Sequence, residues 1–320
     1  MSPVTKLRSS PTKKVPFAPL FVALRPRQWL KNVLVFAAPL FSFSSNPWDW
    51  INAMIAGVSF CAMSSAVYLL NDLRDLEADR RHPRKRYRPI AAGWVKPDHA
   101  LLTSILLFLG SLIFGRHSPG LAAVLLIYAG IQANYILWLK QQPLLDILCI
   151  ASGFLLRAIA GGTGTDIPLS PWFLLTVGLL ALFLAIEKRR AELRISRLQG
   201  KPTRAVLQRY SFSLLQRLES MVSTSAFMSY ALWSAGPVLG GAPTRWMLLT
   251  LPFVLVGIFR YQLLSDPDES DRRQSLGLSE STESPEEILI GDRGIQLILL
   301  GWLLTVVSIN VAHNFDLISR

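Results

Sequence analysis

The sequence predicts an all-helical integral membrane protein, and three observations support this. Of the 320 residues, 51% are hydrophobic and only 17% are charged. The apolar residues gather in long segments, and the cations behind the net charge of +12 lie mostly between those segments. This distribution is typical of a membrane protein. Because backbone polar groups find no water inside a bilayer, the segments that cross it are expected to be helices.

Nine segments are long enough, or nearly so, to cross a hydrocarbon core of about 30 Å. The first is the weakest, because Lys31 and Asn32 interrupt it and its continuous apolar part is short. The nine predicted spans are residues 28–45, 51–72, 99–115, 119–138, 144–161, 171–187, 213–235, 245–263 and 294–312.

The charges between the spans predict the orientation. Lys and Arg crowd residues 1–31, 73–96 and 188–209, whereas 161–170 and 236–244 contain neither. The positive-inside rule therefore places the N-terminus in the cytoplasm and the C-terminus outside. We expect a cytoplasmic tail at 1–24 and one membrane domain at 25–320. Its cytoplasmic loops would be 73–98, 188–212 and 264–293.

Two classes of site are excluded by composition and spacing. The chain is basic, but its cations lie between apolar spans and it has no recognised nucleic-acid module, so the expected partner is the lipid bilayer and not nucleic acid. Cys61 and Cys149 lie inside apolar segments without metal-ligand spacing, which predicts neither a disulfide framework nor a zinc site.

The strongest candidate site follows the second span. Asp72, Asp75 and Asp79 stand at i, i+3 and i+7 and fall within about 60° on one helical face, which Tyr68 shares. Three carboxylates so close together need a cation, and hard oxygen ligands beside a phosphate-bearing substrate favour Mg²⁺. Downstream cations are placed to bind phosphate oxygens, and they are Arg80, Arg81, Arg84, Lys85, Arg86 and Arg88. The alternative is a solvated helix end followed by a positive-inside loop.

Two stretches here carry a resemblance to a known family. They read Asn71-Asp72-x-x-Asp75-x-x-x-Asp79 and Lys85-Arg86-Tyr87-Arg88-Pro89-Ile90-Ala91-Ala92-Gly93. Together they resemble the first Asp-rich motif and the following R-P-(I/L)-x-x-G segment of the UbiA-type membrane prenyltransferase superfamily. Within it, residues 25–32, 187–193 and 284–293 look most like the polyprenyl-phosphate phosphoribosyltransferases.

This resemblance implies a UbiA-like helical bundle in the bacterial inner membrane with its active site facing the cytoplasm. It also implies an Mg²⁺-dependent pentosyltransferase, with the metal on Asp72, Asp75 and Asp79 and with Lys31, Asn32, Asn71 and Tyr68 in the site. The implied substrates are phosphoribosyl pyrophosphate and a decaprenyl-like polyprenyl monophosphate. The product would be 5-phosphoribosyl-1-phosphoryl-polyprenol, a lipid-linked pentose for cell-envelope polysaccharide. Whether the chain forms a homo-oligomer stays open.

The segment after the sixth span departs from the superfamily pattern. Members that use an isoprenyl diphosphate donor typically carry a second D-x-x-x-D motif there, whereas this chain has Glu187-Lys188-Arg189-Arg190-Ala191-Glu192. The adjacent cations change the local field from metal binding toward anion binding, so we assign Glu187, Lys188 and Arg189 to substrate phosphates. A solvated charged loop is the alternative.

Two ionisable residues lie inside the fifth span. Asp146 and Arg157 are eleven residues apart, close to three helical turns, and therefore face nearly the same way. Ionisable groups in a span normally face the bundle interior or a polar cavity. We predict that both contact substrate, while a structural hydrogen-bonding role remains open for Arg157.

Two other functions stay open. One is isoprenyl transfer from a polyprenyl diphosphate to an aromatic or quinone precursor, against which the altered second motif argues. The other is a lipid-phosphate transporter with the Asp cluster as its coupling site. Against it, these charges lie at helix ends, whereas coupled transporters usually bind near the midplane.

Overall fold

The computed structural model describes residues 18–82, 85–199, 205–266 and 291–317, together with positions 268, 269, 272 and 288. Within these residues the chain is helical, with no strand. The elements are α1 Pro19–Ala23, η1 Pro26–Phe36, α2 Ala37–Phe41, α3 Pro47–Arg74, α4 Leu76–Arg81, η2 Lys85–Tyr87, α5 Pro97–Gly115, α6 Pro119–Leu137, η3 Leu139–Gln141, α7 Leu145–Thr165, α8 Pro171–Gln199, η4 Ala205–Arg209, α9 Phe212–Ser234, η5 Pro237–Leu239, η6 Arg245–Thr250, α10 Leu251–Ser265 and α13 Arg293–Asn314.

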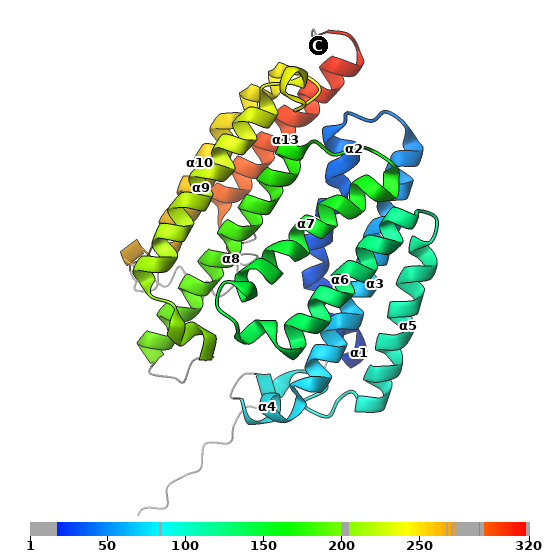
Figure 1. Ribbon diagram of the computed structural model, residues 1–320, viewed down its shortest axis with the longest axis vertical. Coiled ribbons are helices and arrows are strands. Elements are labelled where there is room, and N and C mark those ends of the chain that lie inside the picture. The colour runs from blue at the N-terminus through cyan, green and yellow to red at the C-terminus, as the bar shows by residue number, and fades with distance from the viewer. Residues whose placement is uncertain are drawn as a thin grey trace, which may run out of the picture.

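The long helices run side by side in one bundle, with α4 at one end and the C-terminal end of α13 at the other (Figure 1). We call the end that carries Asp72, Asp75 and Asp79 the motif end. Helix α1 packs there, since Ala23 is buried in a cluster with Leu69 and Ile90. Residues 18–24 therefore belong to the fold and not to the predicted tail, whose residues 1–17 lie outside the described part.

Seven helical segments in the described residues are long and apolar enough to cross a membrane. They are α3, α5, α6, α7, α8 up to Arg197, η6 with α10, and α13. This confirms the all-helical membrane class, but it does not confirm the predicted count of nine. The predicted span 213–235 is the continuous helix α9, which is not among the seven.

The first predicted span is wrong as a continuous helix, because residues 26–36 form the 3₁₀ helix η1 and only five residues of α2 follow. This 3₁₀ helix is inserted between α3 and α7. Its Val35 carbonyl lies where a side chain on Gly161 of α7 would be, since a Cβ there would come within 2.0 Å of that oxygen. The glycine thus permits close packing that brings the polar Lys31 and Asn32 inside the bundle.

The helix η1 runs antiparallel to α3 and turns one face toward it. The indole of Trp29 donates to Ser65 at 2.9 Å, and Asn32 Nδ2 donates to Cys61 Sγ at 2.9 Å. Further along, Phe36 lies against Gly57. This pairing fixes how deep each η1 residue sits relative to the Asp residues on α3.

The predicted loop 188–212 is mostly helical. Helix α8 continues through Gln199, and η4 covers Ala205–Arg209. The 29 residues of α8 make it longer than a membrane crossing requires, so its charged end projects from the apolar part of the bundle. Most of the predicted loop 264–293 lies outside the described residues.

Candidate functional site

The three Asp residues lie where α3 passes into α4. Asp75 joins the two helices, and the hydrogen bonds from Asp75 N to Asn71 O at 3.0 Å and from Asp79 N to Asp75 O at 2.8 Å continue the i to i−4 pattern through the junction. Asp72 and Asp79 are buried, at 3% and 2% exposure, whereas Asp75 is partly exposed. The predicted shared face is therefore retained in the fold.

Each carboxylate contacts a cation from another part of the chain. Arg88 Nη1 donates to Asp72 Oδ1 at 3.0 Å and to Asp79 Oδ2 at 2.6 Å. Arg25 Nη2 donates to Asp72 Oδ1 at 2.5 Å, and Lys140 Nζ lies 3.0 Å from Asp75 Oδ1. These contacts offset the mutual repulsion of the carboxylates, and they place three cations beside any ligand that binds here.

The donor set suits Mg²⁺ in its usual mode, but it is not a preformed metal site. No group of three His, Cys, Asp or Glu side chains in the described residues is arranged to hold a metal, so an Mg²⁺ site on all three Asp residues stays a prediction. Asp72 and Asp79 converge on one nitrogen of Arg88. Two convergent carboxylates are what Mg²⁺ uses when waters and substrate phosphates complete its shell.

The remaining predicted residues of this region are placed less centrally. Tyr68 lies under the Arg25 guanidinium, 4.9 Å from it, and Asn71 is half-buried beside Asp72.

The downstream cations differ in exposure. Arg80 is exposed and pairs with Glu77, while Arg86 is exposed and stacks on Tyr87. Lys85 is half-buried, and Arg84 lies outside the described residues. Of the predicted phosphate-binding cations, Arg88 contacts two of the Asp residues, Asp72 and Asp79.

A second ionic cluster joins α7, α8 and Tyr210, which follows η4. Arg189 Nε donates to Asp146 Oδ2 at 2.7 Å, and the two side chains are 1% and 0% exposed. Arg189 Nη1 also donates to Glu192 at 2.5 Å. Because Asp146 and Arg189 form a buried ion pair with each other, this geometry does not support their predicted contacts with substrate. It makes the pair a structural link between α7 and α8.

Tyr210 completes this cluster. Its hydroxyl donates to Asp146 Oδ1 at 2.7 Å and accepts from the Leu144 amide at 2.6 Å. Burial raises the pKa of the Tyr210 phenol, and the Asp146 carboxylate raises it further. The phenol therefore stays protonated and serves as a donor.

Glu187 and Lys188 lie on α8 directly before Arg189. Glu187 is buried and accepts a 2.6 Å hydrogen bond from Arg190, while Lys188 is half-buried. Nearby on α9, the buried Glu219 accepts from Gln262 of α10 at 2.5 Å. Glu187 is thus paired within α8, and the role of Lys188 toward substrate phosphate stays a prediction.

The predicted residues Lys31, Asn32 and Arg157 meet deeper in the bundle. Arg157 Nε donates to Asn32 Oδ1 at 2.6 Å, and both residues are buried. The Lys31 ammonium lies 5.6 Å from the centroid of the Phe154 ring on α7. The structure therefore brings together Lys31 and Asn32, which were predicted from the resemblance, and Arg157, which was predicted as an ionisable residue inside a span.

Two cations of the site were missed among the predicted residues. Arg25 precedes η1 in the left-handed conformation, with φ 57°, and Lys140 lies in the short η3 turn between α6 and α7. The basic run around Trp29 was a signal for Arg25. For Lys140 the only signal in the sequence was its position, as a single cation in a turn between two predicted spans.

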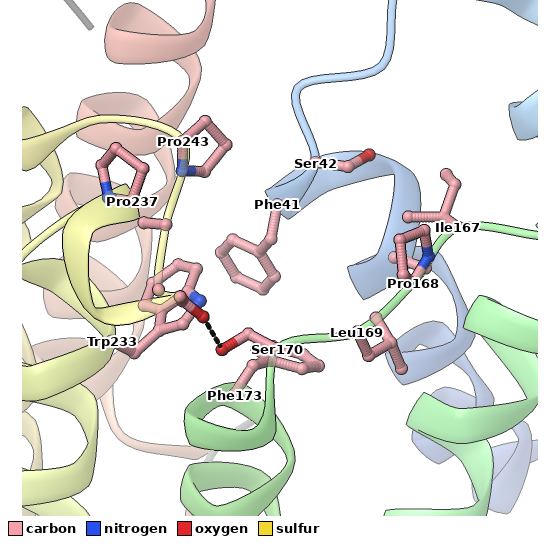
Figure 2. A pocket seen from close by; sticks show the side chains of 14 residues that line it. Phe41, Ser42, Ile167, Pro168, Leu169, Ser170, Phe173, Trp233, Pro237 and Pro243 are labelled. Carbon is pink, nitrogen blue, oxygen red and sulfur yellow. Dashed lines mark hydrogen bonds between the residues drawn. The ribbon is translucent and has the colours of Figure 1, made fainter.

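One cavity of about 420 Å³ lies at the opposite end of the bundle, between α2, the α7–α8 connection and the loop around η5 (Figure 2). Phe41 projects into it from α2, near Trp233 and Phe173, and Ser170 donates to the Gly240 carbonyl at 2.5 Å. None of its lining residues is ionisable. It therefore lacks the acids, bases and cations that phosphoryl or pentosyl chemistry needs.

Comparison with known proteins agrees with this architecture. The model of the UbiA prenyltransferase family matches residues 33–279. The chain is 38% identical over 300 residues to a decaprenyl-phosphate phosphoribosyltransferase of Mycolicibacterium smegmatis, covering 90% of this chain and 91% of that protein. It is 38% identical over 290 residues to the decaprenyl-phosphate phosphoribosyltransferase of Mycobacterium tuberculosis, covering 89% and 91%.

The fold is also that of a solved structure, a UbiA homolog from Archaeoglobus fulgidus bound to DMAPP and Mg²⁺. The two superpose with a TM-score of 0.66 at 18% sequence identity, over 92% of this chain and 99% of that one. At this identity the likeness establishes the bundle and not the substrate.

Proposed function

The chain belongs to the UbiA prenyltransferase family, and from this we propose that it transfers a 5-phosphoribosyl group from phosphoribosyl pyrophosphate to decaprenyl phosphate. The observation that carries the proposal is the 38% identity to the Mycolicibacterium smegmatis decaprenyl-phosphate phosphoribosyltransferase over about nine-tenths of both chains. The charges at the motif end support it, because both substrates carry phosphate.

The residues at the motif end would bind the diphosphate of the donor. Asp72 and Asp79 would hold Mg²⁺, which, when bound, neutralises part of the diphosphate charge and makes it a better leaving group. Arg25 and Arg88 already lie against these carboxylates and are placed to bind the remaining oxygens. Lys140, from η3, extends the positive field to the side of Asp75.

In the proposed reaction an oxygen of the lipid phosphate attacks the anomeric carbon of the ribose. The bond from that carbon to the diphosphate breaks, and pyrophosphate leaves with the electron pair. The attacking oxygen is already anionic at neutral pH, so the protein needs no strong general base. Its role is to place two anionic groups close together, which requires cations, and Lys188 of α8 and the motif-end Arg residues supply them.

The isoprenoid tail requires an apolar environment. Leaving it in water would cost about 0.8 kcal/mol per CH₂ group. Exposed Leu, Ile and Phe side chains cover the outward faces of α5, α6 and α13, where lipid would surround the bundle. The acceptor would therefore approach from the membrane while the donor comes from the aqueous side, which the basic loops predict to be the cytoplasm.

The second motif disfavours isoprenyl transfer to an aromatic acceptor. A donor in which the diphosphate is held by two metal-binding motifs would need carboxylates on α8, but Glu187 is engaged by Arg190 and Arg189 pairs with Asp146. A lipid-phosphate transporter is disfavoured because Asp72 and Asp79 lie at the end of the bundle, whereas coupled transporters usually bind near the bilayer midplane.

The decisive test supplies purified protein with radiolabelled phosphoribosyl pyrophosphate and decaprenyl phosphate, with and without Mg²⁺. We expect a labelled lipid product that requires both substrates and the metal. A parallel reaction offers polyprenyl diphosphate and 4-hydroxybenzoate. A prenylated aromatic product there, with no ribosylated lipid in the first reaction, would overturn the proposal.

A further inference from the structure

Arg157 is a buried cation whose surroundings are neutral. It is 4% exposed and lies within α7, one of the two most buried spans. Its contacts are the Asn32 side-chain oxygen at 2.6 Å, the Gly153 carbonyl at 2.5 Å, and the rings of Phe60 and Tyr128 at 5.0 and 5.2 Å. Among the described residues, no carboxylate lies within ion-pair distance of it.

The other site arginines differ in this respect. Arg189, equally buried, contacts the carboxylates of Asp146 and Glu192. Arg25 and Arg88 contact Asp72, and Arg260 contacts Asp292 through two hydrogen bonds. A charge inside a bundle is costly unless an opposite charge compensates it, and neutral acceptors and aromatic faces do so only in part. Arg157 therefore suits an anionic ligand.

The position of Arg157 sets which part of a substrate it can meet. Its partner Asn32 contacts Cys61, which stands eleven residues before Asp72 on α3, or about 16 Å along the helix axis. Its Nη1 bonds the Gly153 carbonyl, one turn toward the motif end, so the guanidinium is directed to that side. The Lys31 ammonium lies over Phe154 in the same direction. The Arg157 guanidinium is therefore too deep to contact a diphosphate group that is bound at Asp72 and Asp79.

We propose that Arg157, held by Asn32, binds a phosphate monoester inside the bundle, at a site separate from the diphosphate site at Asp72 and Asp79. The inference rests on the proposed function and extends it, because that reaction has two such monoesters. One is the 5-phosphate of the donor and the other is the phosphate of the lipid acceptor. The Arg157 guanidinium would bind the phosphate group that both molecules carry.

The packing leaves room for the guanidinium. A Cβ on Gly153 would lie 3.3 Å from Arg157 Nη1 and 3.8 Å from both Gln132 Nε2 and the Tyr128 ring. The space above Gly153 is thus shared by the guanidinium and neutral polar groups. A larger residue there would move the guanidinium while preserving its charge.

The test compares Arg157→Gln, which removes the charge, with Arg157→Lys, which keeps it, and with Arg116→Gln as a control. Arg116 is exposed at the opposite end of the bundle, so its variant loses the same charge away from the interior. KM for phosphoribosyl pyrophosphate and KM for decaprenyl phosphate are measured separately, with kcat. We expect Arg157→Gln to raise one of the two KM values by about 10- to 100-fold, while Arg157→Lys stays within a few-fold.

The substrate whose KM rises identifies the source of the phosphate. Gly153→Ala should raise the same KM by several-fold, and it provides a second readout if Arg157→Gln does not fold. Unchanged KM values in both Arg157→Gln and Gly153→Ala would overturn the inference. So would equal impairment of the Gln and Lys variants, which indicates a hydrogen-bonding role only. Those outcomes leave the proposed function intact, whereas a wild-type protein that makes no ribosylated lipid would overturn both.

Discussion

At the scale of residues, Asp72, Asp75 and Asp79 differ in burial and in partners although they share one helical face. Asp72 accepts from two arginines, Asp79 from one, and Asp75 contacts a lysine while partly exposed. The 3.6-residue period of the helix predicted the shared face. It could not identify Arg25 or Lys140, which lie 47 and 65 residues away from their partners, because such contacts depend on how distant segments pack.

We expect Asp72→Asn and Asp75→Asn each to lower kcat by at least about 100-fold with little change in thermal stability, because each removes a charge that orients cations and metal at the diphosphate. Initial rates at saturating Mg²⁺ measure this. Glu77→Gln is the matched control, since Glu77 lies on α4, is exposed and pairs with Arg80. Near-wild-type rates in either Asp variant would contradict the site assignment.

The Asp146–Arg189 pair makes a different prediction. Asp146→Asn leaves the Arg189 charge buried against one fewer carboxylate, and breaking such a pair typically costs about 3–5 kcal/mol. The free energy of unfolding in detergent should therefore fall by that amount. The double variant Asp146→Leu/Arg189→Met should lose less than the two single variants combined. Additive losses would show that the two residues are not coupled.

At the scale of elements, η1 is the part that the sequence could not predict correctly. Its apolar residues look like a weak span, and nothing in their local pattern distinguishes a membrane helix from an eleven-residue 3₁₀ segment inside the bundle. Such long 3₁₀ helices are uncommon, since their hydrogen bonds are less well aligned. Here the contacts with α3 and α7 support it, including the close approach at Gly161.

Gly161→Ala should test this packing. Its Cβ would lie 2.0 Å from the Val35 carbonyl oxygen, so η1 would have to shift and take Lys31 and Asn32 with it. We expect a lower melting temperature and at least a several-fold lower kcat/KM. Gly178→Ala on α8 is the matched control, because a Cβ there meets nothing within 4 Å. That control should be neutral or stabilising by up to about 1 kcal/mol, as helical Gly→Ala changes often are.

At the scale of the whole molecule, apolar composition predicted the class because each span must satisfy its own backbone in lipid. Length alone could not fix the number of spans. Helix α9 is as long as the others, but it carries Gln216, Arg217 and Glu219, of which Glu219 is buried and accepts a hydrogen bond from Gln262 of α10. Where polar side chains find partners inside the protein, a hydropathy criterion fails to recognise the helix as a possible membrane span.

The two ends of the described chain lie at opposite ends of the bundle. The described chain begins at the motif end with α1 and ends at the opposite end with α13 (Figure 1). An odd number of crossings produces this arrangement, and the basic residues at the motif end predict that this end faces the cytoplasm.

Single cysteines can test this orientation in a background where Cys61 and Cys149 are replaced by Ser and Ala. Arg80→Cys at the motif end, where the native side chain is 49% exposed, should react with a membrane-impermeant thiol reagent only in inside-out vesicles. Arg116→Cys and Val238→Cys, exposed at the opposite end, should react only in intact spheroplasts. Labelling of Arg80→Cys from outside would place the Asp residues on the side where a cytoplasmic phosphoribosyl donor cannot reach them. The proposed reaction would then be untenable even if the metal and phosphate contacts were correct.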